Sequence, residues 1–147
     1  MKPKELLQML ERYFEQNPKD VPAIHLWGSP GIGKSQIIRQ AATNAFITTI
    51  AEMRLKDEDQ KSFFKDIRLL LYDPTDLRGL PAIKGDTAIW LPPSALPHKE
   101  RDAKRGVILL DELPEAPTLV KTSAYRLVLD REIEEYSVPD GWFIIAA

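Results

Sequence analysis

The sequence predicts an α/β fold in which helices cover both faces of a mainly parallel sheet. A mostly apolar run at 23–27 and continuous apolar runs at 107–110 and 142–147 predict strands that are buried on both faces. The first run leads into a glycine-rich loop and then into a stretch with helical apolar spacing. We therefore expect a three-layer sandwich over residues 1–147.

Composition limits the class of protein. A chain of 147 residues suits one domain that buries about 70% of its unfolded surface. The net charge of −2 gives no nucleic-acid signal. The chain has no cysteine for a disulfide or a metal site, and two histidines argue against a histidine-rich zinc site. The first ten residues lack a signal-peptide core, and no run approaches 18 apolar residues, so we expect a cytoplasmic protein without a membrane span.

The chain begins with a predicted helix at 3–16, which Asn17-Pro18 ends. An apolar stripe along it consists of Leu6, Leu7, Leu10, Tyr13 and Phe14. We expect this stripe to pack against the domain. The alternative, in which the helix end with Val21 and Pro22 forms part of a base pocket, stays open.

The glycine-rich loop follows strand 23–27. Gly28, Gly33, Lys34 and Ser35 fit the phosphate-loop pattern G-x-x-x-x-G-K-[ST]. Glycines let phosphate oxygens approach backbone N–H groups, and a helix that starts near Gly33 adds its positive dipole end. Lys34 would reach the β- and γ-phosphates of ATP, and Ser35 would bind Mg²⁺. The nucleotide-binding residues are predicted to be Gly28, Ser29, Pro30, Gly31, Ile32, Gly33, Lys34, Ser35 and Gln36.

The helix that follows this loop buries a face made of Ile37, Ile38, Ala41 and Ala42. The alternative interpretation of the loop is a glycine-rich turn without a ligand, which gives the Lys34-Ser35 pair no structural reason. Residues 47–53 either extend the helix or form a short strand.

The next stretch contains a charged run and a further strand. The run KDEDQK at 56–61 is expected to be a solvated loop or helix face. The run DIRLLLY at 66–72 predicts a second core strand, and the turn-rich DPTDLRGLP follows it. Asp73, Asp76 and Arg78 should lie at its carboxyl end. The two aspartates cap turns or, alternatively, mark a second metal position.

Residues 81–92 predict a small β-hairpin that turns around Lys84-Gly85-Asp86. Trp90 is its large apolar residue and either packs in the core or contacts a partner. The run HKERDAKR at 98–105 is expected to be an exposed connector.

Two acids follow the strand predicted at 106–112, GVILLDE. Asp111 and Glu112 come directly after a buried run, where carboxylates are costly unless they face a cation or solvent. Beside a phosphate loop, Asp111 would orient Mg²⁺ and Glu112 would be the general base for the attacking water. Two acids at an ordinary strand end are the alternative. The predicted catalytic residues are thus Glu112 and Lys34, and the metal residues are Ser35 and Asp111.

The remaining chain predicts a helix, a hairpin-like piece and a last strand. The helix at 117–131 would bury one face made of Leu119, Val120, Ala124, Leu127 and Val128. The piece EIEEYSVPDG follows, with Pro139-Asp140-Gly141 as its turn. The strand WFIIAA occupies 142–147.

Taken together, the phosphate loop, DPTDLRGLP, AIWLPPSALP, GVILLDEL and the segment from Leu127 to Ala147 resemble the MoxR-like branch of the AAA+ ATPases. The resemblance runs from about residue 22 to the end. It implies a P-loop NTPase core at 21–147 behind a helix within 1–20, with strand order 1-4-3-2. It implies ATP binding and hydrolysis in a ring, usually hexameric, that remodels a protein client. The loop 28–35 matches Walker A, 107–112 matches Walker B, and the hairpin matches an insertion that faces the pore or a partner.

The chain departs from that family in two ways. Pro114 and Glu115 stand where relatives often have Asn-Arg. Relatives also continue with a sensor asparagine, an arginine finger, a fifth strand and a helical lid, so we expect a core truncated at its C-terminus. Such a core should bind ATP better than it hydrolyses it, and strand 23–27 should be a sheet edge prone to association.

Two other functions remain open at this point. The chain could be a non-hydrolysing nucleotide-binding module that associates with a full-length ATPase partner. It could instead be a small-molecule kinase, which would need a lid with arginines near the γ-phosphate, and no segment stands out for that role.

Overall fold

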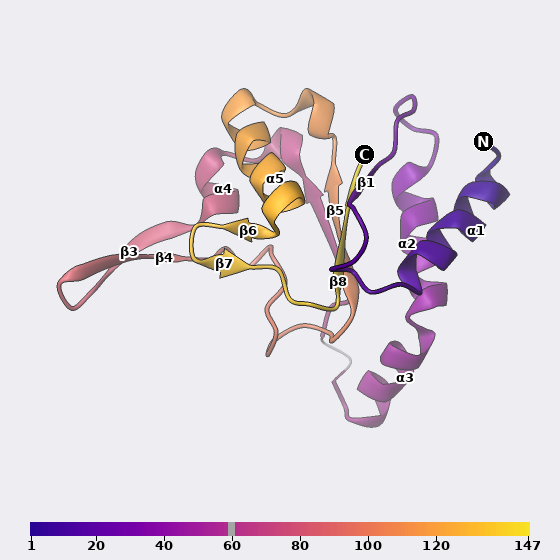
Figure 1. Cartoon of the computed structure of the whole chain (residues 1–147), viewed down its shortest axis with the longest axis horizontal. Helices are drawn as coiled ribbons and strands as arrows, with labels where there is room; N and C mark the ends of the chain where they lie inside the picture. The colour runs from indigo at the N-terminus through magenta and orange to yellow at the C-terminus, as the bar shows by residue number, and fades with distance from the viewer. Residues whose placement is uncertain (59–60) are drawn as a thin grey trace.

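A computed structural model describes residues 1–58 and 61–147. Four strands form one parallel sheet in the order β1-β8-β5-β2 (Figure 1). This is the predicted order 1-4-3-2. The strand bounds are β1 Ile24–His25, β2 Phe64–Arg68, β5 Gly106–Asp111 and β8 Trp142–Ala146.

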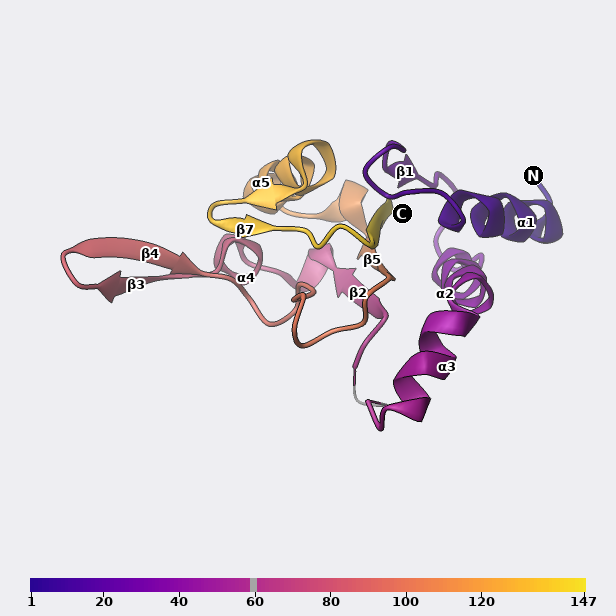
Figure 2. The same cartoon turned by 60° about the horizontal axis from the view of Figure 1, so that its bottom comes forward.

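Helices cover both faces of the sheet (Figure 2). Along β5, Val107 and Leu109 face one apolar core, and Ile108 and Leu110 face another, because successive side chains of a strand point to opposite sides. The first core includes α1 (Pro3–Phe14) and α2 (Lys34–Ala45), and the second includes α4 (Pro74–Arg78) and α5 (Thr118–Asp130). This arrangement confirms a three-layer α/β fold.

The N-terminal helix α1 lies where the apolar stripe predicts it. Its residues Leu10, Tyr13 and Phe14 are buried against α2 and the sheet. The Phe14 and Phe143 rings meet edge to face with centroids 5.1 Å apart. The helix therefore packs against the domain, as expected.

The segment after α2 is helical. Phe46 interrupts the helix, and α3 then runs over Ile47–Leu55. The short-strand alternative is thus wrong. The prediction for the charged run at 56–61 falls partly on residues 59–60, which lie outside the described residues.

Two predicted strands differ from the observed ones. The predicted strand 23–27 contains only a two-residue edge strand, and the Trp27 side chain is 79% exposed instead of covered. The predicted strand 66–72 begins earlier and ends at Arg68, after which Leu69–Leu71 form a 3-10 helix (η1). Arg68 pairs with Asp111, the last residue of β5, so the neighbouring strand offers no further partner.

Helix α5 buries Val120, Ala124 and Leu127, as its periodicity predicts. Leu119 is exposed, so its assignment to that face is wrong. A short 3-10 helix (η2, Leu113–Glu115) connects β5 to this helix region. The predicted turn at Pro139-Asp140-Gly141 is present, since the Trp142 N–H donates to the Pro139 carbonyl oxygen at 3.0 Å. It is not the turn of the hairpin, because β6 (Glu132–Ile133) and β7 (Tyr136–Ser137) are joined at 134–135.

The hairpin of β3 (Leu80–Lys84) and β4 (Thr87–Leu91) projects from the body of the molecule (Figures 1 and 2). Lys84 pairs with Thr87, so Gly85 and Asp86 form the turn, within the predicted Lys84-Gly85-Asp86. Trp90 lies at its base, outside both apolar cores, with the Arg78 guanidinium 4.7 Å from its ring centre. The interpretation of Trp90 as a core residue is therefore wrong. Its contact with a partner stays a prediction.

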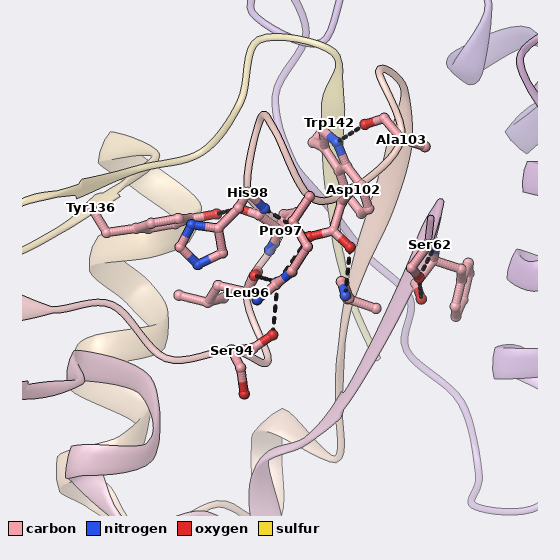
Figure 3. Close-up of polar contacts among 12 residues, drawn as sticks. Ser62, Ser94, Leu96, Pro97, His98, Asp102, Ala103, Tyr136 and Trp142 are labelled. Atoms are coloured by element: carbon pink, nitrogen blue, oxygen red, sulfur yellow. Dashed lines mark hydrogen bonds and ion pairs between the residues drawn. The ribbon is translucent and has the colours of Figure 1, made fainter. Parts of the chain in front are cut away.

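The connector 98–105 is not simply exposed. Asp102 is only 4% exposed, and its carboxylate accepts bonds from the His98 N–H at 2.9 Å and from Arg101 at 2.8 Å, and pairs with Lys65 at 2.9 Å (Figure 3). A buried carboxylate is costly unless donors surround it, as they do here. Burial by itself raises the pKa of Asp102, but these partners outweigh it, and the net pKa lies below the ordinary value.

Candidate functional site

The carboxyl ends of β1, β5 and β2 meet at one edge of the sheet, where the glycine-rich loop joins β1 to α2. In open parallel sheets, this edge is where ligands bind. A cavity of about 450 Å³ lies here. Its walls include Gly28, Lys34, Ser35, Arg68, Asp111 and Glu112.

A larger groove of about 1160 Å³ lies elsewhere, beside the start of β5 and β8. It is bounded by the end of α1, the connector 103–105 and the segment 135–141. We place the functional site at the smaller cavity, because the glycine-rich loop and the acids at the end of β5, Asp111 and Glu112, converge there and are absent from the walls of the groove.

The glycine-rich loop has the backbone that its composition predicts. Gly31 has φ 78° and Gly33 has φ 85°, a left-handed region that favours glycine. Gly33 caps α2, and the first N–H groups of a helix have no partner inside it. The cavity therefore receives backbone donors and the positive end of a helix dipole, which suit an anion.

Of two side chains at the start of α2, one closes the loop on itself and the other joins it to the sheet. The Lys34 ammonium donates a hydrogen bond to the Gly28 carbonyl oxygen at 2.8 Å, across the loop. The Ser35 hydroxyl donates to Oδ2 of Asp111 at 2.8 Å. The loop and the end of β5, far apart in the sequence, are thus in direct contact.

Asp111, the last residue of β5, and Glu112, which follows it, line the same cavity. Oδ1 of Asp111 accepts the Glu112 N–H at 3.1 Å, so both carboxylate oxygens of Asp111 are engaged. Glu112 has φ 58°, a left-handed conformation that is unusual for a residue with a side chain. This turn ends the strand and leaves Glu112 on the cavity wall.

The structure brings some of the residues predicted for this site together and leaves others outside it. Lys34, Ser35, Asp111 and Glu112 are brought together. Of the loop residues, Gly28, Pro30, Gly31, Gly33 and Gln36 also line the cavity, whereas Ser29 and Ile32 do not.

The aspartates after β2 are not part of this cavity. Asp76 accepts the Asp73 N–H at 2.7 Å as a cap of α4, which favours the capping interpretation over a second metal position. Arg78 pairs with Glu134 at 3.2 Å instead of facing a ligand.

His25 and Arg68 line the cavity and were missed by sequence reasoning. His25 stacks on Trp27 with ring centres 4.4 Å apart, and no described residue bonds its buried Nε2. Burial and then the charge of Lys34 lower the pKa of His25, which favours a neutral imidazole. Both residues end observed strands, β1 and β2, but they lie inside the predicted strands 23–27 and 66–72, so the sequence carries no local signal for them.

The residues fit Mg²⁺ better than a transition metal. Within 1–58 and 61–147, no cluster of three or more His, Cys, Asp or Glu side chains could form a protein cage for a metal. A hydroxyl and a carboxylate in contact, as in Ser35 and Asp111, suit Mg²⁺, which keeps several waters and takes further oxygens from phosphates.

The fold has a counterpart among solved structures. The chain is similar to the crystal structure of NtrX from Brucella abortus, with a TM-score of 0.55 and 18% sequence identity. The match covers 97% of this chain and 29% of that one, so the chain spans less than a third of the NtrX length. At this identity the likeness concerns the fold alone. No protein-family model matches the chain, and no curated protein matches it.

In the part of the chain that the structure describes, no helix combines the length and the apolar character that a bilayer crossing requires.

Proposed function

We propose that this chain binds ATP with Mg²⁺ and hydrolyses it, as the cytoplasmic P-loop core of a MoxR-like AAA+ machine that remodels a protein client. The observation that carries the proposal is the 2.8 Å contact between Ser35 and Asp111. It joins a loop suited to phosphate to an acid suited to Mg²⁺, and Glu112 lies on the same cavity wall.

In this proposal, each residue of the site has a distinct role. The loop N–H groups and Lys34 bind the β- and γ-phosphates, while Ser35 and Asp111 hold Mg²⁺ directly or through its waters. Bound Mg²⁺ would neutralise charge on the phosphates. Glu112 accepts a proton from the water that attacks the γ-phosphate.

The projecting hairpin β3–β4 supports the proposed contact with a protein partner or with other subunits of a ring. Three large apolar side chains on it face solvent: Leu80, Ile83 and Leu91, with Ile83 87% exposed. Exposed apolar side chains that cluster on one projecting element are typical of interaction surfaces.

Replacing Lys34 with alanine tests the phosphate-binding role. The variant should bind ATP more weakly by about 1.5–3 kcal/mol, the range for a hydrogen bond to a charged group. Isothermal titration calorimetry with Mg²⁺ and ATP measures this change. Lys84→Ala, at the end of β3 and outside the walls of the cavity, is the control and should keep wild-type affinity. Equal affinities for Lys34→Ala and wild type would remove the phosphate-loop assignment.

The competing function, a nucleotide-binding module that does not hydrolyse ATP, gives a different result. Turnover measured over a wide range of protein concentration should rise more than in proportion if subunits complete each other's sites. ATP binding with no turnover at any concentration would favour the module.

A further inference from the structure

A second cation faces the phosphate cavity from the sheet. Arg68 is the last residue of β2, and its register partner is Asp111. Neighbouring residues of paired parallel strands point to the same side of the sheet, so Arg68 and Asp111 share a face. Phe64, four residues earlier on that face, packs in the core that includes α2. Arg68 therefore points to the side of the sheet on which α2 begins, and it lines the same cavity as Lys34.

The charges around the cavity indicate a role for Arg68 in binding an anion. Three acids line it, Asp111, Glu112 and Glu115, against two full cations, Lys34 and Arg68. A polyphosphate adds further negative charge. Lys34 approaches from the loop side, whereas Arg68 approaches from β2, beyond β5. A bound triphosphate thus meets one cation on each side.

The guanidinium of Arg68 is available for such a contact. Among the described residues, it forms no ion pair, whereas Arg78, Arg101 and Arg126 each pair with a carboxylate. Burial and the charge of Asp111 raise the pKa of Asp66, two residues earlier on the same face, and the charge of Arg68 partly offsets this rise, but within 1–58 and 61–147 the two side chains form no salt bridge. Guanidinium groups bind phosphate oxygens with two parallel N–H donors, a geometry that lysine lacks.

We propose that Arg68 contacts the terminal phosphate of the bound nucleotide and so makes the site discriminate ATP from ADP. This inference rests on the proposed nucleotide-binding function. Lys34 would reach the β- and γ-phosphates from the loop, and Arg68 lines the cavity from β2, beyond Asp111, so the phosphate that Arg68 would meet is expected to be the terminal one, which ADP lacks.

Replacing Arg68 with alanine tests the inference. Dissociation constants are measured by calorimetry for Mg²⁺ with ADP and for Mg²⁺ with adenosine 5′-(β,γ-imido)triphosphate, which is not hydrolysed. We expect Arg68→Ala to weaken binding of the triphosphate by about 10- to 100-fold, the range for a charged hydrogen bond, and to change ADP binding by less than about twofold. Arg68→Lys should recover part of the loss.

Arg39→Ala is the matched control. Arg39 lies on the same side of the sheet, with its guanidinium 4.2 Å from the centre of the Phe64 ring, and does not line the cavity. Its removal should leave the ratio of the two dissociation constants unchanged. Equal weakening of both nucleotides by Arg68→Ala, or no weakening, would overturn the role of Arg68. Failure of the wild-type chain to bind either nucleotide would instead overturn the proposed function.

Discussion

Replacing Glu112 with glutamine is expected to lower ATP turnover by about 10²- to 10⁴-fold, the usual contribution of a general base. Glutamine keeps the size of the side chain but cannot accept the proton of the attacking water. ATP affinity should stay close to that of the wild type, because in the proposed site the phosphate contacts would come from the loop, Lys34 and Ser35. The variant should therefore hold ATP without consuming it.

The measurement is single-turnover hydrolysis of labelled ATP with protein in excess, since turnover by this chain is expected to be slow. Glu132→Gln changes an exposed glutamate outside the cavity and should match the wild type. If Glu112→Gln and wild type hydrolyse ATP at equal rates, Glu112 is not the general base.

Replacing Asp102 with asparagine is expected to lower the free energy of unfolding by about 3 kcal/mol or more, the cost of breaking a buried ion pair by removing one partner. Lys65 would keep its charge with its side chain only 18% exposed, and Arg101 would lose its carboxylate. Urea denaturation followed by circular dichroism measures the change.

Asp140→Asn is the control for this experiment. Asp140 pairs with Lys19 at 3.3 Å, but both side chains are mostly exposed, and such pairs contribute about 0–1 kcal/mol. Similar losses in both variants would show that burial of Asp102 does not determine its contribution.

The pH dependence of stability offers an independent test of Asp102. Its pKa is lowered in the folded state, so its contribution is fully present above the ordinary aspartate pKa of about 3.9 and is lost as pH falls through the lower folded pKa. The difference in stability between wild type and Asp102→Asn should thus be constant near pH 6–7 and shrink below about pH 4.

Much of the site was predictable because its signals are local. Lys34 and Ser35 belong to one short pattern, and Asp111 and Glu112 directly follow one apolar run. The same runs predict the sheet order once the family resemblance supplies the connectivity. Arg68 was missed because its place on the cavity depends on the pairing of β2 with β5, which no local pattern reveals.

The errors in the fold also come from long-range effects. Leu69–Leu71 has the composition of a strand, but β5 ends at Asp111 and offers no further partner. Asp102 sits in a charged run that reads as solvated, and the cation that pairs with it inside the protein, Lys65, comes from β2. The turn that closes the β6–β7 hairpin at 134–135 contains glutamates and was missed, whereas Pro139-Asp140-Gly141, with the usual turn residues, forms a turn after the hairpin.

The left-handed backbone of Glu112 lowers the stability of the folded chain, while its side chain is the proposed general base. A residue with a side chain is disfavoured in this region by about 1 kcal/mol relative to glycine. Glu112→Gly should therefore raise the melting temperature, since glycine keeps the N–H bond to Asp111, while it removes the carboxylate. Glu112→Gly would thus exchange the proposed general base for a less strained turn, and we expect a higher melting temperature together with a loss of ATP turnover.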